Sequence, residues 1–312
     1  MTADLLLTAQ ISTIKPNRTV KVKMAKQKFW ITCLALGALS IYLFVSAPPP
    51  LAEKTAADAA IPVERMFEIL KAENDVVRAM WTKEVVGAGK QTGLKFDERW
   101  READVEAGPL PALFLRETAK SLEKNPTPLS LFLGSDYPVN SANRFEGLQL
   151  EKFQVVKQTL KPQFFFMPDI QMQVAMFADI AVVEGCIQCH NKHEQSPKHD
   201  WKLNDVMGAT TWMYPSGSIS MDELLRTLTA LRQGFKDTYE AYLEKARKFA
   251  DPPAIGEHWP AEGYFLPSSE VFMGEIAKRT APQTLAALSV LADKPQLGSA
   301  TNKEGGFFAL AR

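Results

Sequence analysis

The chain has 312 residues, with 36 lysine and arginine side chains balanced by 36 aspartate and glutamate side chains. This composition is that of an ordinary globular protein and excludes a fibrous or disordered chain. With zero formal net charge and no basic stripe beyond the N-terminal arm, the sequence does not predict nucleic-acid binding. Three cysteines, Cys33, Cys186 and Cys189, are too few for a disulfide framework.

The first 62 residues have the pattern of a membrane-targeting device. A basic arm (1–28) precedes an uncharged apolar run (29–47) and a Pro- and Ala-rich linker (48–62). Since roughly 20 apolar residues cross a bilayer and cations stay on the cytoplasmic side, the run predicts a transmembrane or signal-anchor helix with residues after Pro48 outside. A secretory signal with late cleavage fits the same pattern, although Pro48 disfavours a cut after Val45-Ser46-Ala47. Both alternatives export the rest of the chain.

The next part, residues 63–215, shows helical patterns first and strand patterns afterwards. Apolar spacing predicts a long helix from Val63 to Val86 that ends at Gly87 and Gly89. Two more helices are expected over 112–124 and 145–160, and a buried strand or short helix over 129–133. Strands are expected over 163–167 and 171–183, joined by a turn at Pro168-Asp169, and over 206–214. These elements together predict an α+β domain with an antiparallel sheet.

Residues 216–312 are predicted to form a helical C-terminal extension. Ser220 and Glu223 have the spacing of a capping box, followed by a leucine stripe, and predict a helix from Ser220 to about Ala250. Shorter helices are expected over 269–279 and 282–292. The leucine stripe would pack on the preceding domain or form a partner or homodimer surface.

Cys186-Ile187-Gln188-Cys189-His190 is the attachment signature of a c-type haem. Two thiols at this spacing add across the vinyl groups of one haem, and the adjacent histidine binds the iron. Cys186 and Cys189 are therefore predicted to bind one covalent haem c, with His190 as the proximal iron ligand. Three other interpretations stay open: a zinc site that adds His193 and His199, a thioredoxin-like dithiol, and a structural disulfide.

The segment from Cys186 to Gly208 resembles the core of the single-haem, PAS-like c-type haem domain family. Similar motifs stand upstream, in 78–82 with Val85-Val86, 93–97, 109–117 and 137–140, so that the resemblance covers about residues 70–215. It implies a periplasmic PAS-like antiparallel sheet with flanking helices and one haem, found alone or as the sensory part of longer signalling proteins.

Other haem-contacting residues are expected from their chemistry. Candidates for the sixth iron ligand are methionines and histidines, with Met80 and Met207 preferred, and an open or water-bound position is an alternative. Arg78, Lys198 and Lys202 are candidates to neutralise the haem propionates. Trp201 is expected in the apolar shell around the ring, and His193 is expected to cap local backbone or to meet a propionate.

The sequence therefore predicts a membrane-anchored, mono-haem c-type cytochrome of the inner membrane, with its folded part in the periplasm and a protein redox or signalling partner. No catalytic set accompanies the motif, so an enzyme is not expected. A haem-based redox or gas sensor that acts through a separate transmitter is the first alternative. A structural zinc or scaffold protein is the second.

Overall fold

A computed structural model describes residues 29–30, 33–34, 36–40, 42 and 60–292. Within these residues no helix is both long enough and apolar enough to span a bilayer. The arm (1–28), nearly half of the apolar run (29–47) and most of the linker (48–62) lie outside the described part. The description below concerns the unit that begins at Asp58.

A four-stranded antiparallel sheet forms the middle of this unit, with the order β4-β7-β6-β5. Its strands are β4 (Ser130–Gly134), β5 (Gln163–Met167), β6 (Met172–Ile180) and β7 (Val206–Tyr214). The expected β5–β6 hairpin and the strand over 206–214 are confirmed, and the expected strand or short helix over 129–133 is a strand, which spans Ser130–Gly134. The mixed helix-and-strand fold with an antiparallel sheet is therefore confirmed.

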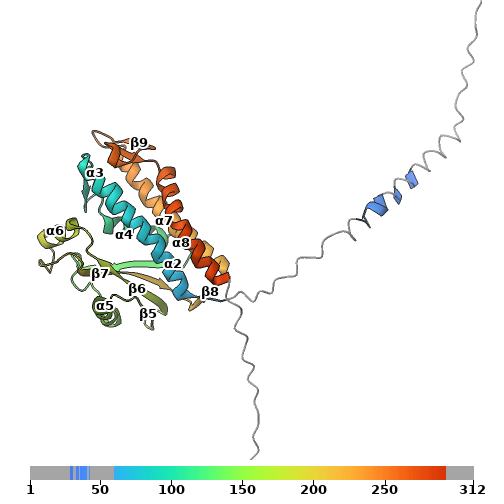
Figure 1. Ribbon diagram of the computed structural model, residues 1–312, viewed down its shortest axis with the longest axis horizontal. Helices are drawn as coiled ribbons and strands as arrows, with labels where there is room; N and C mark the ends of the chain where they lie inside the picture. The colour runs from blue at the N-terminus through green and yellow to red at the C-terminus, as the bar shows by residue number, and fades with distance from the viewer. Residues whose placement is uncertain (1–28, 31–32, 35, 41, 43–59, 293–312) are drawn as a thin grey trace, which may run out of the picture. The chain divides into compact units, whose positions relative to one another are not determined.

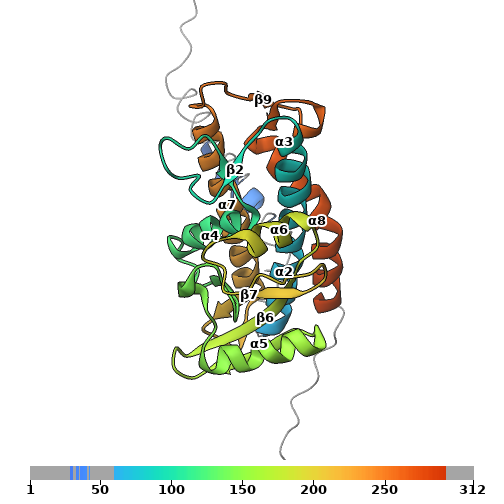
Figure 2. The same ribbon diagram turned by 90° about the vertical axis from the view of Figure 1, so that its left-hand side faces the viewer.

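Helices cover both faces of the sheet (Figures 1 and 2). One face packs against a layer formed by α2 (Val63–Met80), α4 (Pro111–Glu123), α7 (Met221–Ala246) and α8 (Ser269–Ala292). The other face packs against α5 (Gly147–Thr159) through Phe153 and Val156. Side chains alternate along β6. Phe177 therefore packs in the core between the sheet and the four-helix layer, and Met176 packs in the core between the sheet and α5.

Short elements complete the unit. Two-stranded pairings join β1 (Ile61–Pro62) to β8 (Ser218–Ile219), β2 (Phe96–Asp97) to β3 (Gly108–Pro109), and β9 (Ala254–Gly256) to β10 (Phe265–Pro267). Helical turns occur at η2 (Ser141–Asn143) and η3 (Pro260–Glu262).

The prediction that Gly87 and Gly89 end the first helix was wrong. The chain continues from α2 through a π-helical segment, η1 (Trp81–Gly87), into α3 (Ala88–Gln91). Gly89 allows the Leu94 side chain to pack closely against the helix backbone, because an added Cβ would lie 2.9 Å from that side chain. The helix ends only at Gln91, ahead of Gly93 with its positive φ of 101°.

The two short helices expected after residue 268 are one helix, α8, with Pro282 in its interior. Proline removes a backbone donor and usually breaks a helix. Here contacts to α2 and η1 hold the helix on both sides of the proline: Arg279 pairs with Glu84, and Thr284 donates to Glu73 at 2.7 Å.

The helix that begins after Ser220 belongs to the same core as residues 63–215. Ser220 accepts a hydrogen bond from the Glu223 N–H at 3.2 Å, as the capping pattern predicted, but the Glu223 carboxylate accepts from the Tyr214 hydroxyl instead of completing the box. Leu224 and Leu231 of the leucine stripe are fully buried. Leu224, Leu228 and Leu231 thus pack inside the unit, while Leu225 is exposed.

A dense aromatic cluster joins the helical layer. Trp81 stacks on Phe114 of α4 with ring centroids 4.4 Å apart, and Tyr239 of α7 stacks on Phe272 of α8 at 4.0 Å. The Trp81 indole N–H donates to the Pro109 carbonyl at 3.2 Å. Aromatic pairs of this kind stabilise a fold beyond the effect of burying their surface. They therefore help to hold α2, α4, α7 and α8 together as one layer.

A buried ion pair also joins this layer. Glu73 on α2 is 1% exposed and accepts two hydrogen bonds from Arg232 of α7, at 2.9 and 2.6 Å. We predict that Arg232→Ala lowers the free energy of unfolding by about 2–3 kcal/mol, because it leaves a buried carboxylate without its cation.

Urea unfolding followed by circular dichroism measures this loss. The control is Arg65→Ala, which removes the exposed Arg65–Glu68 pair and should cost less than about 1 kcal/mol. Equal losses in the two variants would contradict the prediction.

Candidate haem-binding site

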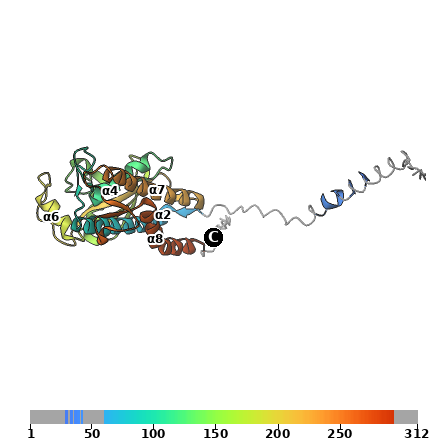
Figure 3. The same ribbon diagram turned by 90° about the horizontal axis from the view of Figure 1, so that it is seen from above.

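The cysteine motif lies in the connection between the two central strands of the sheet. After β6 ends at Ile180, the chain forms α6 (Glu184–Lys192) and a loop (193–205) before β7 begins at Val206. In Figures 1 and 3, α6 projects at one end of the unit. Because Cys186, Cys189 and His190 follow the three- and four-residue spacing of an α-helix, they share one face of α6.

Both motif cysteines are free thiols. Burial raises the pKa of Cys186, although the nearby Arg78 charge opposes this, and burial together with Glu98 raises the pKa of Cys189 against the opposing charge of Lys90. Both thiols are therefore protonated at neutral pH.

His190 carries a buried polar atom without a partner. Its Nδ1 is shielded from solvent and makes no hydrogen bond within the described residues. Burial and the neighbouring His193 lower the pKa of the imidazole, so the ring is neutral at pH 7. A neutral imidazole has one nitrogen lone pair to offer, and buried polar groups normally have a partner, so this ring is suited to bind a ligand.

The two other histidines near the motif have partners elsewhere. His193 accepts from the Gln195 N–H at Nδ1, 3.1 Å away, and its Nε2 lies 3.1 Å from the Glu98 carboxylate. His199 Nδ1 lies 2.9 Å from the Asn191 carbonyl oxygen. The prediction that His193 caps local backbone is confirmed.

Across residues 60–292 and the described part of 29–42, no three His, Cys, Asp or Glu side chains are grouped so as to hold a metal ion. Cys186, Cys189, His193 and His199 are therefore not assembled into a tetrahedral set.

Asn191, directly after His190, ties the loop to the motif helix. Its side-chain amide donates to the Trp201 carbonyl at 2.9 Å and accepts from the Trp201 N–H at 2.8 Å. Its own carbonyl is the partner of His199. Residues 199–201 are thereby fixed against α6. Nothing in the sequence marks Asn191 for this role, since its partners come from a loop without regular structure.

Trp201 forms the apolar wall beside α6. It is 4% exposed and packs with Ala181, Ile187 and Met207, while its indole Nε1 is buried without a hydrogen-bond partner in the described part of the chain. Lys198 lies over the ring, with Nζ 4.8 Å from the centroid, and also pairs with Asp200. The Lys202 side chain is exposed. Of the predicted loop residues, Trp201 and Lys198 thus lie together at the motif.

Arg78 approaches the motif from α2. It pairs with Asp179 at the end of β6 and donates to the Thr210 hydroxyl at 3.3 Å, and Thr210 donates to Asp179 at 2.9 Å. Burial lowers the pKa of the guanidinium, but Asp179 more than compensates, so the pKa is raised. Arg78 therefore stays charged beside Cys186, with a carboxylate partner that the sequence did not predict.

The two candidate methionines occupy different surroundings. Met207, the second residue of β7, packs in the cluster with Trp201 and Ile187 of α6, and its carbonyl accepts from the Ser135 hydroxyl at 2.6 Å. Met80 is 1% exposed and packs in the main core between the helical layer and the sheet. The fold thus brings Met207 to the motif helix and places Met80 in the main core.

Comparison with known protein families is informative for this part of the chain. The family model described as Tll0287-like matches residues 52–215, which is more than half of the sequence. The chain belongs to the Tll0287-like family. Tll0287-like domains are cytochrome-like, single-haem domains. No curated protein and no solved structure is similar enough to be matched.

The Tll0287-like match begins before the expected start near residue 70 and ends, as expected, at residue 215. It therefore contains α2, the whole four-stranded sheet and α6, but not α7 or α8. The candidate site is made entirely from the matched part.

The residues of this Tll0287-like domain fit a covalently bound haem. Two free thiols and the His190 imidazole share one helical face, and neither His190 Nδ1 nor the Trp201 indole N–H has a hydrogen-bond partner among the described residues. Around them, Val182 and Leu203 expose 63% and 43% of their surface, and the Asn204 N–H to Ala181 carbonyl bond holds their segments together.

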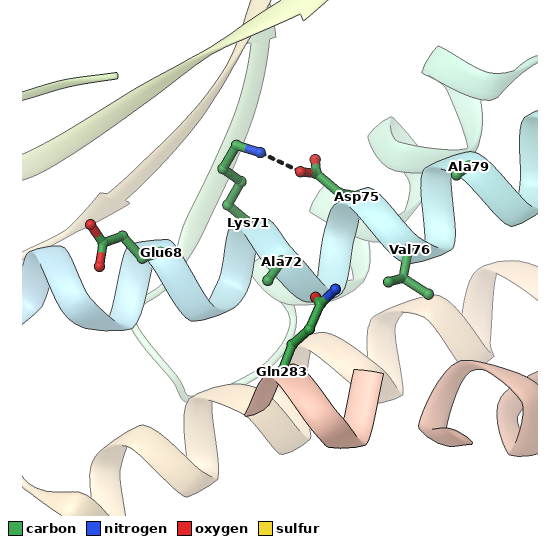
Figure 4. A pocket seen from close by; sticks show the side chains of 7 residues that line it. All are labelled: Glu68, Lys71, Ala72, Asp75, Val76, Ala79 and Gln283. Atoms are coloured by element: carbon green, nitrogen blue, oxygen red, sulfur yellow. Dashed lines mark hydrogen bonds and ion pairs between the residues drawn. The ribbon is translucent and has the colours of Figure 1, made fainter. Parts of the chain in front are cut away.

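A separate groove of about 430 Å³ lies on the outer side of α2 and faces Gln283 of α8 (Figure 4). Glu68, Lys71 and Asp75 line it, and the last two form an ion pair across one helical turn. It contains none of the predicted haem-binding residues.

We predict that Asn191→Ala loosens the loop that follows the motif. Two hydrogen bonds are lost, so the free energy of unfolding should fall by about 2 kcal/mol. Amide hydrogen exchange over 193–205 should rise, and this is the measurement that checks the prediction.

Asn191→Asp is the matched control. It keeps the acceptor for the Trp201 N–H but loses the donor to the Trp201 carbonyl, so its exchange should lie between those of the wild type and Asn191→Ala. Unchanged exchange in Asn191→Ala would contradict the assigned clamp.

Proposed function

We propose that this protein is a membrane-anchored, periplasmic mono-haem c-type cytochrome that exchanges single electrons with a protein partner. The observation that carries the proposal is the unpartnered, neutral His190 imidazole on the same helical face as two free thiols. The Tll0287-like family membership supports the same conclusion.

Each site residue then has a defined task. Cys186 and Cys189 would hold the haem by thioether bonds, and His190 would bind its iron as the proximal ligand. Ile187, Trp201 and Met207 would exclude water from the ring, which raises the reduction potential. The Trp201 indole N–H and the Arg78, Lys198 and Lys202 cations are the groups proposed to meet the propionates. When bound, the haem supplies one-electron exchange at its iron.

The setting of the site supports the rest of the proposal. The antiparallel sheet with helices on both faces is compatible with a PAS-like domain. The basic arm and apolar run of residues 1–47 are those of an anchor that exports the domain, and attachment of haem c requires such export. No set of nucleophile, base or paired carboxylates accompanies the motif, so we propose a carrier and not an enzyme.

Covalent attachment is tested by expressing the full chain with a c-type haem maturation system. We expect the intact mass to increase by one haem, with a pyridine haemochrome typical of two thioether bonds. Cys186→Ser or Cys189→Ser should leave one thioether and one conjugated vinyl group, which moves the haemochrome band to longer wavelength. The double variant should carry no covalent haem.

Cys33→Ser is the control, because that cysteine lies in the predicted anchor, and its spectrum should match the wild type. An intact chain at its unmodified mass would refute the proposal.

For the sixth ligand we propose Met207, since it lies with the motif helix and Met80 does not. We predict that Met207→Leu abolishes the far-red methionine-to-iron band of the oxidised protein and lowers the reduction potential. Met80→Leu should keep both and cost about 1 kcal/mol of stability, as volume-conserving core changes do. Absorption spectra and potentiometry of the two variants decide the matter: retention of the band in Met207→Leu excludes this ligand.

A haem-based sensor is the second candidate, and one feature of α2 favours it. The helix that places Arg78 beside Cys186 passes directly into the π-helical η1, which contacts α4 and, through Arg279 and Glu84, α8. π-Helical segments are frequent at functional sites. Binding of carbon monoxide distinguishes the two candidates, because a carrier whose two axial ligands are both protein side chains would not bind it. A sensor binds it and changes the protease sensitivity of α7.

A further inference from the structure

The edge of the sheet formed by β5 is unusually apolar and unpaired. β5 is the last strand of the order β4-β7-β6-β5, so alternate N–H and C=O groups of Gln163–Met167 point away from β6. The strand carries no charge, and Phe164 and Phe166 expose 36% and 41% of their surface. Exposed, uncharged edges of this kind pair with another strand unless they are protected.

No other element of the described chain protects this edge. α5 contacts β5, β6 and β7, which places it across the face of the sheet and not along its edge. The opposite edge strand, β4, is packed against α4 and bridged beyond its end by Ser135 and Arg144. β5 is thus the free edge of the sheet.

The sequence around β5 is chemically self-complementary. If two copies of β5 pair antiparallel about a two-fold axis through Phe165, Phe164 faces Phe166 and Gln163 faces Met167. Beyond the strand, each copy carries Lys161 and the exposed Leu160 before β5, and Asp169 and the exposed Ile170 in the turn after it. This register uses the whole strand, and shifting it leaves strand residues unpaired.

The charges at the two ends match this arrangement. Lys161 and Asp169 are exposed, and neither side chain forms an ion pair within the described residues. Lys161 precedes β5, and Asp169 lies in the hairpin turn that follows it. Antiparallel pairing therefore brings the end of β5 that carries Lys161 in each copy beside the turn that carries Asp169 in the other, twice per dimer. Isologous contacts have this reciprocity.

Side-chain packing also continues across such a contact. Phe164 packs edge-on against Phe177 of β6, with ring centroids 5.9 Å apart. A two-fold axis perpendicular to the sheet keeps like faces together, so Phe164 and Phe166 of both copies form one apolar row. We propose that a second copy of this chain pairs with it through β5, to form one continuous antiparallel sheet. This assembly goes beyond the proposed haem function and does not depend on it.

Charge reversal in the detergent-solubilised full chain tests the proposal. Sedimentation equilibrium of the wild type should give a monomer–dimer equilibrium. In K161E two carboxylates face each other at each end of the contact, and in D169K two ammonium groups do so. Each variant alone should raise the dimer dissociation constant by about tenfold, because two contacts change from attraction to repulsion. The increase should shrink in high salt.

Mixing the two variants gives the decisive result. In the mixed dimer the glutamate of K161E faces the lysine of D169K, and the native aspartate faces the native lysine, so affinity should return to near the wild-type value. The double variant K161E/D169K should dimerise as the wild type does, and K248E, an exposed reversal away from β5, should change nothing. Failure of the mixture to recover, or dimerisation unaffected by either reversal, overturns the proposal and indicates association through the anchor or another face.

Discussion

The antiparallel pairing of β6 with β7 is the interaction on which the rest of the structure depends. The register runs from Gln173 opposite Tyr214 to Ile180 opposite Val206, with an irregularity after Asp179. Because the two strands are neighbours, their connection must return to the same end of the sheet. That connection holds the cysteine motif, so the pairing places Cys186, Cys189 and His190 at one sheet end, beside α2.

Two kinds of contact make this connection a defined surface. Polar contacts hold its backbone: Asn191 binds both the N–H and the carbonyl of Trp201, and backbone bonds join Ala181 to residues 204 and 205. Apolar contacts hold its side chains, as Trp201, Ile187 and Met207 pack together. The hydrogen bonds orient the loop, while His190 Nδ1 is buried and has no hydrogen-bond partner in the part of the chain that the structure describes. At the motif, the described part of the chain leaves two buried polar atoms, His190 Nδ1 and the Trp201 indole Nε1, without a partner, and these are the atoms that a bound ligand would face.

The helical layer determines how rigidly this end of the sheet is supported. α2 contributes Glu73 to the buried pair with α7 and Arg78 to the pair with Asp179, so one helix connects the core to the candidate site. The aromatic cluster around Trp81 joins the helices on both sides of residue 215. The C-terminal helices therefore support the domain that binds the proposed haem, although they lie outside the matched family region.

Local pattern determined much of this protein. The alternation in 163–167 and 206–214 and the helical spacing after Val63 and Ser220 specify elements that the structure contains, because the periods of strands and helices are local properties. The cysteine motif itself, with its exact spacing, is also a local property. What lies across space from it was decided only by the tertiary structure: Asp179 beside Arg78, Glu98 beside His193, Asn191 clamping Trp201, and Met207 rather than Met80 at the motif helix. The same holds for Gly89 and Pro282, whose local preference to end a helix was overcome by packing against Leu94 and α2. Glycine and proline destabilise a helix interior by up to about 3 kcal/mol, and the free energy gained by burying apolar side chains in a shared core is larger.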